Sequence, residues 1–187
     1  MDQKKRNNKA WLTQTYPDTQ KIPFFFFWGH QPSADGSITK SCLSQWWVAP
    51  FQVKDVVYPT AEHWMMAEKA RLFKDEKALA NILASPTPAR AKEEGRLVQN
   101  FDPIIWDLHK FDVVVEGNSH KFSSNQALKD FLLGTGQQVL VEASPGDNIW
   151  GIGMGQDNPA ARDPQSWRGE NLLGFALMEV RVILNEK

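Results

Sequence analysis

The acid Glu62 stands at the start of a predicted helix, where a carboxyl group could serve as a general acid or base. It belongs to the segment Pro59–Trp64, in which Thr60 has the residue type of an N-cap. Lys69 falls two turns further along the same helix face, where its amine could contact a phosphate or lower the pKa of Glu62. A simpler interpretation is that Glu62 only stabilises the positive end of the helix dipole.

A second acid, Asp147, follows Pro145 and Gly146 and precedes Trp150 in a segment rich in Gly, Pro, Asp and Asn. Such a position suits a plain turn residue, but it also suits a functional loop. Trp106 stands at the head of another predicted helix, where it could be a core residue or an aromatic face on which a planar base stacks. Taken alone, neither Asp147 nor Trp106 shows whether its role is structural or functional.

Several familiar kinds of site are excluded by residue type and spacing. The four histidines have no zinc-ligand spacing with cysteine or carboxylates, and the single cysteine, Cys42, excludes an internal disulfide. The glycines from Gly151 to Gly155 are followed by Gln156–Pro159 rather than a helix, so they fail the test for a dinucleotide-binding turn. We therefore expect no metal, no cofactor, and no covalent serine or cysteine chemistry. His63 points away from Glu62 on the helix and is expected to be a structural hydrogen-bonding residue.

The composition of the 187-residue chain is that of an ordinary globular protein, with 42% hydrophobic and 23% charged residues. A net charge of −1 excludes a general attraction to nucleic acid. Lys4, Lys5, Arg6 and Lys9 cluster near the N-terminus, and we predict that residues 1–22 form a disordered tail and 23–187 a single domain. No apolar run is long enough to span a bilayer and no signal peptide is evident, so a cytoplasmic protein is expected.

The hydrophobic periodicity predicts an α+β fold, a mostly α-helical single domain with a small β-sheet. Helices are expected from Thr60, from Asp75 to Ala84, from Pro88 to Glu94, from Asp102 to about Gly117 with fraying toward Phe122 as the alternative, from Ser124 to Leu133 and from Leu172 to Leu184. Strands are expected at 24–28, 46–48, 52–58, 139–143 and 149–150, and 144–167 is expected to form a long functional loop.

A set of motifs in fixed order resembles the NADAR (YbiA-like) family from about Phe24 to Ile183. The set comprises the Pro59–Trp64 segment after a short strand, Leu43-Ser44-Gln45-Trp46-Trp47 upstream, Trp106, Asp147-Asn148-Ile149-Trp150-Gly151-Ile152-Gly153, and Gly169-Glu170-Asn171-Leu172-Leu173-Gly174. Some relatives carry an acid directly after the Trp-Gly pair, where this chain has Ile152. The resemblance implies a YbiA-like fold and an N-glycosidase that cleaves N-ribosyl bonds.

The resemblance also implies which residues do the chemistry. It places Glu62, Trp106 and Asp147 in the catalytic site, and residue types suit substrate binding at Lys69, Trp150, Gly151, Asn171 and Trp46. Breaking a bond between C1′ of ribose and a base nitrogen builds positive charge on the sugar. A carboxylate can stabilise that charge, and a carboxyl group can activate water or protonate the leaving base. Asn171 could instead only cap the last helix.

Two substrate classes are implied for this bond type. One is ADP-ribose attached to guanine bases, including bases of single-stranded nucleic acid, because a duplex base must first be exposed. The other is the ribosylaminopyrimidine 5′-phosphate intermediates of riboflavin biosynthesis. A small-molecule or nucleotide substrate is thus expected, with no membrane partner. The alternative is a non-catalytic module that binds ADP-ribose or NAD, for which the acids Glu62 and Asp147 would both be unnecessary.

Overall fold

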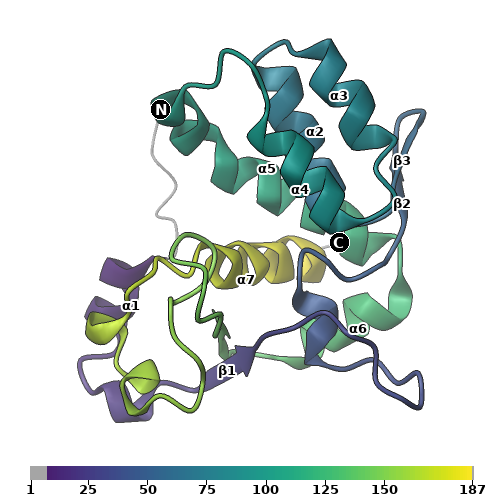
Figure 1. Ribbon diagram of the computed structural model, residues 1–187. Coiled ribbons are helices and arrows are strands. Elements are labelled where there is room, and N and C mark those ends of the chain that lie inside the picture. The colour runs from purple at the N-terminus through teal and green to yellow at the C-terminus, as the bar shows by residue number, and fades with distance from the viewer. Residues whose placement is uncertain (1–7, 187) are drawn as a thin grey trace.

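The computed structural model describes residues 8–186, which form a predominantly helical α+β domain (Figure 1). Its α-helices are α1 (Lys9–Thr15), α2 (Ala61–Leu72), α3 (Glu76–Leu83), α4 (Pro88–Arg96), α5 (Pro103–Ser123), α6 (Gln126–Gly134) and α7 (Leu172–Asn185). Short 3-10 turns lie at Thr19–Lys21, Lys40–Leu43, Pro159–Arg162 and Pro164–Ser166. The expected fold class is confirmed.

The strands form two separate two-stranded sheets within the described residues, where the sequence predicted one small sheet. β1 (Phe24–Phe27) pairs in parallel with β4 (Val139–Glu142), with Phe27 opposite Glu142. β2 (Phe51–Val53) and β3 (Val56–Tyr58) form an antiparallel hairpin. Because β1 and β4 run in the same direction, their carboxyl ends meet at one edge, and the chain leaves both strands beside each other there.

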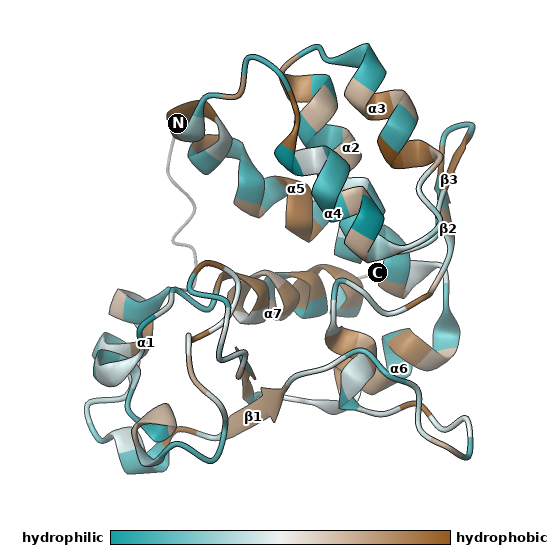
Figure 2. Ribbon diagram, viewed as in Figure 1, coloured by the Kyte–Doolittle hydropathy of each residue, from teal (hydrophilic) through white to brown (hydrophobic). Residues whose placement is uncertain are grey.

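Helix α7 forms the centre of the domain, and the other elements pack around it (Figure 1). It contacts α5, α6 and β4, and most of its side chains are buried. Figure 2 shows this helix largely in the colours of hydrophobic residues, whereas α3 and α4 alternate between hydrophobic and hydrophilic positions. A helix that is apolar on most sides is expected where neighbours cover it all round. Helices α2, α3, α4 and α5 pack against one another on one side of α7.

The helix starts follow the capping chemistry expected from the sequence. The hydroxyl of Thr60 caps α2, Asp75 caps α3, and Asp102 caps α5, whose first residue is Pro103. Helix α5 continues past Gly117 to Ser123, because Gly117 packs against the Trp64 side chain and tertiary contact there outweighs the low helix propensity of glycine.

The structure differs from three sequence-based expectations. Residues 8–22, expected to be disordered, contain α1 and a 3-10 turn, because Leu12 is fully buried and Lys9 donates a hydrogen bond to the Trp167 carbonyl. Residues 1–7 of the expected tail lie outside the described residues. The segments 46–48 and 149–150 form turns and bends instead of strands. Both are short and aromatic, and Trp46 and Trp150 line a cavity instead of pairing in a sheet.

Candidate active site

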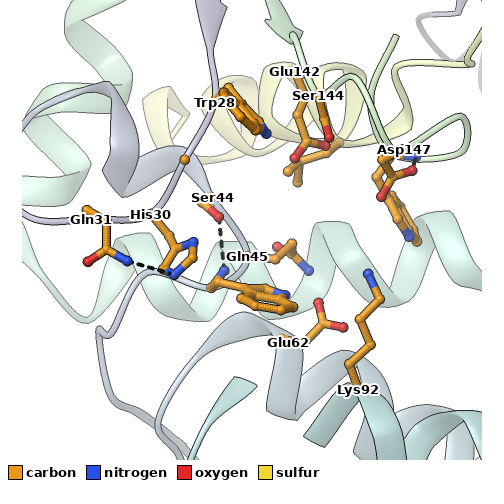
Figure 3. A pocket seen from close by; sticks show the side chains of 14 residues that line it. Trp28, His30, Gln31, Ser44, Gln45, Glu62, Lys92, Glu142, Ser144 and Asp147 are labelled. Atoms are coloured by element: carbon orange, nitrogen blue, oxygen red, sulfur yellow. Dashed lines mark hydrogen bonds between the residues drawn. The ribbon is translucent and has the colours of Figure 1, made fainter. Parts of the chain in front are cut away.

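A cavity of about 350 Å³ lies where the carboxyl ends of β1 and β4 meet the N-terminus of α2 and one face of α4 (Figure 3). Residues 28–31 and 44–46 form one side of the cavity, and the end of β4 with the following loop forms another. The lining residues are Trp28, Gly29, His30, Gln31, Ser44, Gln45, Trp46, Glu62, Lys92, Glu142, Ser144, Asp147, Trp150 and Leu173.

Glu62 is almost completely buried, with 2% of its surface exposed, although it lines the cavity. Its backbone N–H donates to the Gln45 carbonyl at 3.0 Å, which ties the start of α2 to the segment before Trp46. The pKa of Glu62 is raised from 4.5 to about 7, mainly by burial and in smaller part by the charge of Asp147. Lys92 and a hydrogen bond from the Trp46 side chain oppose that rise. Glu62 can therefore exchange a proton near neutral pH.

Glu142, the last residue of β4, supplies a second carboxyl group to the same cavity. Its pKa is raised from 4.5 to about 8, mainly by burial and in smaller part by the charges of Asp147 and Glu62. The negative charge of an ionised Glu62 helps to keep the proton on Glu142. Near neutral pH the cavity can thus present one carboxylate and one protonated carboxyl group to a single substrate.

Asp147 lines the cavity from the loop after β4, as the sequence suggested, and it also shapes that loop. Its Oδ1 accepts hydrogen bonds from the backbone N–H groups of Ile149 at 2.9 Å and Trp150 at 2.8 Å. This Asx-type turn aims Trp150 toward the cavity. Asp147 is therefore a turn residue that also lines the cavity, because one oxygen holds the loop while the carboxylate charge acts on Glu62 and Glu142.

A cation and several aromatic rings complete the lining. Lys92 projects from α4 toward the acids in Figure 3, and its Nζ lies 5.8 Å from the centre of the Trp46 ring. Trp28, Trp46 and Trp150 offer flat apolar surfaces around the acids. Such surfaces favour a planar ring in the substrate, and the lysine favours a negative or electron-rich group.

The structure does not bring every expected site residue to this cavity. Trp106 and Lys69 are absent from its lining. Lys69 instead donates to the Gly95 carbonyl at 2.8 Å and lies over the Phe101 ring, 4.1 Å from its centre. Trp106 packs against the core beside it, with its ring centre 6.0 Å from Lys69 Nζ. Both residues lie on α2 as expected, but the Lys69 amine is bound to the Gly95 carbonyl of α4 and does not line the cavity.

Gly151 and Asn171 do not line the cavity but pack against β4, which carries Glu142. A Cβ atom on Gly151 would come within 2.8 Å of the Glu142 carbonyl, so the loop after Trp150 can approach β4 only with glycine there. Asn171 is fully buried, donates to the Leu140 carbonyl and accepts from the Glu142 N–H. It adopts a left-handed conformation at the start of α7 and makes no side-chain cap bond. Its side-chain hydrogen bonds are with β4, so its side chain does not cap α7.

Most of the other cavity residues were not identified as site residues from the sequence, and Glu142, Lys92 and Gln45 are the polar ones nearest to the chemistry. Glu142 had a signal, because a charged residue that ends the apolar run Val139–Val141 is placed at a strand edge. Lys92 had none, since it is one of several charged residues on α4 and only the packing of α4 against α2 brings it to Glu62. His63, by contrast, is structural as predicted, with its ring nitrogens 2.8 Å from Thr60 Oγ1 and 3.0 Å from the Ser85 carbonyl.

No group of three or more His, Cys, Asp or Glu side chains within residues 8–186 is arranged to hold a metal ion. The same residues contain no helix that is long and apolar enough to cross a membrane. The chemistry of the cavity is carried by carboxyl groups, an amine and aromatic rings. A carboxylate paired with a protonated carboxyl group across one small cavity is the arrangement of enzymes that hydrolyse glycosidic bonds.

Comparison with known proteins agrees with that class. The profile of the NADAR domain family matches residues 26–185. An N-glycosidase of Acanthamoeba polyphaga mimivirus is 44% identical over 146 residues, which cover 74% of this chain and 85% of the relative. N-glycosidase YbiA of Shigella boydii is 31% identical over 132 residues, covering 71% of this chain and 74% of that protein.

A solved structure and a plant relative extend the comparison. The NMR structure of the E. coli protein YbiA superposes with a TM-score of 0.67 at 27% identity, covering 90% of this chain and 92% of that one. A maize protein named riboflavin biosynthesis protein PYRR is 33% identical over 131 residues, which are 66% of this chain but 19% of that protein. The chain belongs to the NADAR family and is classed with its N-glycosyl hydrolases.

Proposed function

We propose that this protein hydrolyses the bond between C1′ of a ribose and a base nitrogen, with ADP-ribosyl-guanine as the favoured substrate. The observation that carries the proposal is the pair of buried carboxyl groups, Glu62 and Glu142, which line one cavity and whose pKa values burial raises to about 7 and about 8. Enzymes separate the roles of two acids by giving them different environments. The pair can therefore supply an acid and a base at the same pH.

Each group has a defined part in the reaction. As the C1′–N bond breaks, its electron pair leaves with the base, and the proton on Glu142 neutralises that base. The Glu62 carboxylate stabilises the positive charge on the ribose and accepts a proton from the attacking water. The water oxygen forms the new bond to C1′, so the products are the free ribosyl sugar and the neutral base. Glu62 is then protonated and Glu142 ionised, and transfer of one proton from Glu62 to Glu142 restores the starting state. Asp147 adds negative charge near the sugar and holds Trp150 in the cavity wall.

An apolar groove of about 380 Å³ continues from the cavity past Trp46 and favours the larger of the two substrates. It shares His30, Gln31 and Trp46 with the cavity, and its other walls are Pro32, Val48, Thr87, Pro88 and Ala89. A substrate with one ribose and one base would fill the cavity alone. ADP-ribose carries a second ribose and an adenine, and a planar apolar ring fits a groove with an indole wall. The net charge of −1 favours a free nucleotide or a single strand over duplex DNA.

The ribosylaminopyrimidine 5′-phosphates are the second candidate, because the maize relative is named as a riboflavin biosynthesis protein. Product analysis separates the two. Purified protein is incubated with ADP-ribosylated guanosine and, separately, with a ribosylaminopyrimidine 5′-phosphate, and the released sugar and base are measured. We expect release from the first at a kcat/KM at least about tenfold higher. Binding without release by the wild type would show a non-catalytic ADP-ribose module instead, whereas release lost in Glu62→Gln with binding kept would support catalysis.

A further inference from the structure

Unsatisfied buried polar atoms gather at the cavity. Within residues 8–186, four buried side-chain nitrogen or oxygen atoms have no hydrogen-bond partner. Three of them belong to residues that line the cavity: Glu62 Oε1, Glu142 Oε2 and Gln45 Nε2. A buried polar atom without a partner is costly, so such atoms point to a ligand that completes them. The two acids have roles in the proposed reaction, and the Gln45 amide has none so far.

The orientation of the Gln45 amide is set by helix α5. Asn118 Nδ2 donates one hydrogen bond to the Val114 carbonyl at 2.8 Å and another to Gln45 at 2.7 Å. The Val114 carbonyl can only accept, so the atom of Asn118 that faces it must be the NH2 group. The Gln45 atom that faces the same NH2 group must then be the oxygen. The NH2 group of Gln45 is left without a partner, and the residue is only 6% exposed.

The segment that carries Gln45 is held on both sides of this residue. Lys121, one turn beyond Asn118 on α5, is fully buried and donates to the carbonyls of Cys42 at 2.7 Å and Ser44 at 2.8 Å. The Gln45 carbonyl accepts from the Glu62 N–H. In Figure 3 the Gln45 side chain lies between those of Glu62 and Glu142. The amide is thus a fixed hydrogen-bond donor beside the two acids.

We propose that Gln45 is a specificity-determining residue whose amide N–H donates to the ring carbonyl oxygen of the departing base. This inference rests on the proposed N-ribosyl hydrolysis. Ribose hydroxyls can donate to the carboxyl groups of the cavity, whereas a carbonyl oxygen only accepts and must meet a donor. Guanine and the aminopyrimidinone of the second candidate both carry such a carbonyl. A hydrogen bond to it also stabilises the electron density that moves onto the base as the C1′–N bond breaks.

The test compares two substrates and two proteins. The substrates are ADP-ribosylated guanosine and the matching 2-aminopurine compound, which has hydrogen in place of the carbonyl oxygen. The proteins are the wild type and Gln45→Met, which keeps the length of the side chain but removes its donor. We expect the wild type to prefer the guanine substrate by about 10- to 100-fold in kcat/KM, because its buried donor stays unpaired with the analogue. Gln45→Met should lose that preference, with its kcat/KM on the guanine substrate falling to about its kcat/KM on the 2-aminopurine substrate.

Two controls keep the outcomes distinct. The wild type alone tests the inference if Gln45→Met fails to fold, because equal rates on the two substrates would overturn it. A parallel loss on both substrates in a folded Gln45→Met would also overturn it and assign the residue a structural role. Binding of free guanine and free 2-aminopurine is measured alongside by calorimetry. No turnover of either substrate by the wild type would refute the proposed function, while a guanine preference in binding that Gln45→Met abolishes would still support the role of the amide.

Discussion

Asn171 Oδ1 accepts a hydrogen bond from the backbone N–H of Glu142 at 2.9 Å, and Asn171 Nδ2 donates to the Leu140 carbonyl at 2.9 Å. The two bonds join the start of α7 to the last residues of β4. These bonds fix the Glu142 backbone and so hold Glu142 in the cavity wall. They also satisfy the Glu142 N–H and the Leu140 carbonyl, which do not pair with β1 on the other side of β4. A residue whose type suggested substrate contact positions an acid instead.

Replacing Asn171 should impair both stability and the function of Glu142. Asn171→Ala leaves the Glu142 N–H and the Leu140 carbonyl unpaired in a buried place, which costs about 1–3 kcal/mol for each group. We expect a lower urea midpoint and a reduced kcat, with a smaller effect on KM because Asn171 does not line the cavity. Asn171→Asp, which keeps the acceptor for Glu142 but loses the donor for Leu140, should recover part of kcat. Equal loss of kcat in both variants would contradict the positioning role.

The rate should depend on pH as the two cavity acids require. Below about pH 7 Glu62 becomes protonated and can no longer stabilise positive charge, and above about pH 8 Glu142 loses the proton that it gives to the base. A narrow bell-shaped profile of kcat/KM with its maximum between these values is expected. Glu142→Gln should lower the maximum about 100-fold or more and remove the alkaline limb. An alkaline limb that survives in Glu142→Gln would assign the proton to another group.

The same burial makes Glu62 a source of pH-dependent instability. Its pKa is about 7 in the folded protein and 4.5 without burial, so the folded state binds more protons in this interval. Stability contributed by the group is consequently greatest below about pH 4.5 and falls as pH rises to about 7. The shift corresponds to about 3 kcal/mol. Glu62→Gln should raise the free energy of unfolding by up to this amount near pH 8 and change it little near pH 4.5, as measured by urea titration at each pH.

The elements of this fold were largely predictable because each is marked by local chemistry. Thr60, Asp75 and Asp102 are caps whose side chains accept from helix N–H groups, and these bonds involve only neighbouring residues. The motif that singled out Glu62 and Asp147 was also informative, since both residues line the cavity. Contacts between residues far apart in the sequence were not predictable. Lys92 reaches the acids only through the packing of α4 on α2.

Trp106 is the opposite case, a residue that the sequence motif assigned to the site and that does not line the cavity. Its place at a helix head is the same whether its ring faces a cavity or the core, and sequence alone assigns neither. The structure places it against the core beside Lys69, whereas Trp46 lines the cavity and the adjoining groove. The aromatic surface available to a substrate is therefore supplied by residues of irregular segments, whose orientation depends on bonds such as those from Lys121.

The two tryptophans provide a direct test of this assignment. Trp46→Ala removes a wall of the cavity and should raise KM about tenfold or more, because an aromatic stacking contact is worth about 1–3 kcal/mol. Trp106→Ala should lower the melting temperature but change kcat/KM by less than about threefold in protein that remains folded. Kinetics below the transition of the less stable variant are compared. A loss of kcat in Trp106→Ala at unchanged stability would restore Trp106 to the catalytic site.

Two glycines in helices allow a matched test of the packing that supports α2 and α5. A Cβ atom on Gly117 would overlap the Trp64 indole, whose Nε1 lies 2.8 Å from that position and donates to the Val113 carbonyl at 2.9 Å. A Cβ atom on Gly134 would meet nothing within 4 Å. Gly117→Ala should therefore cost about 1–3 kcal/mol of unfolding free energy through overpacking.

Gly134→Ala is the control, since alanine there should leave stability unchanged or raise it by about 0.5–1 kcal/mol by restricting the unfolded chain. Urea denaturation of both variants measures the difference. Trp64 stands two residues after Glu62, so a displaced indole in Gly117→Ala should also move the first turn of α2. We expect kcat/KM to fall in Gly117→Ala and to stay at the wild-type value in Gly134→Ala. Unchanged stability and activity in Gly117→Ala would show that the α2–α5 contact is looser than the structure describes.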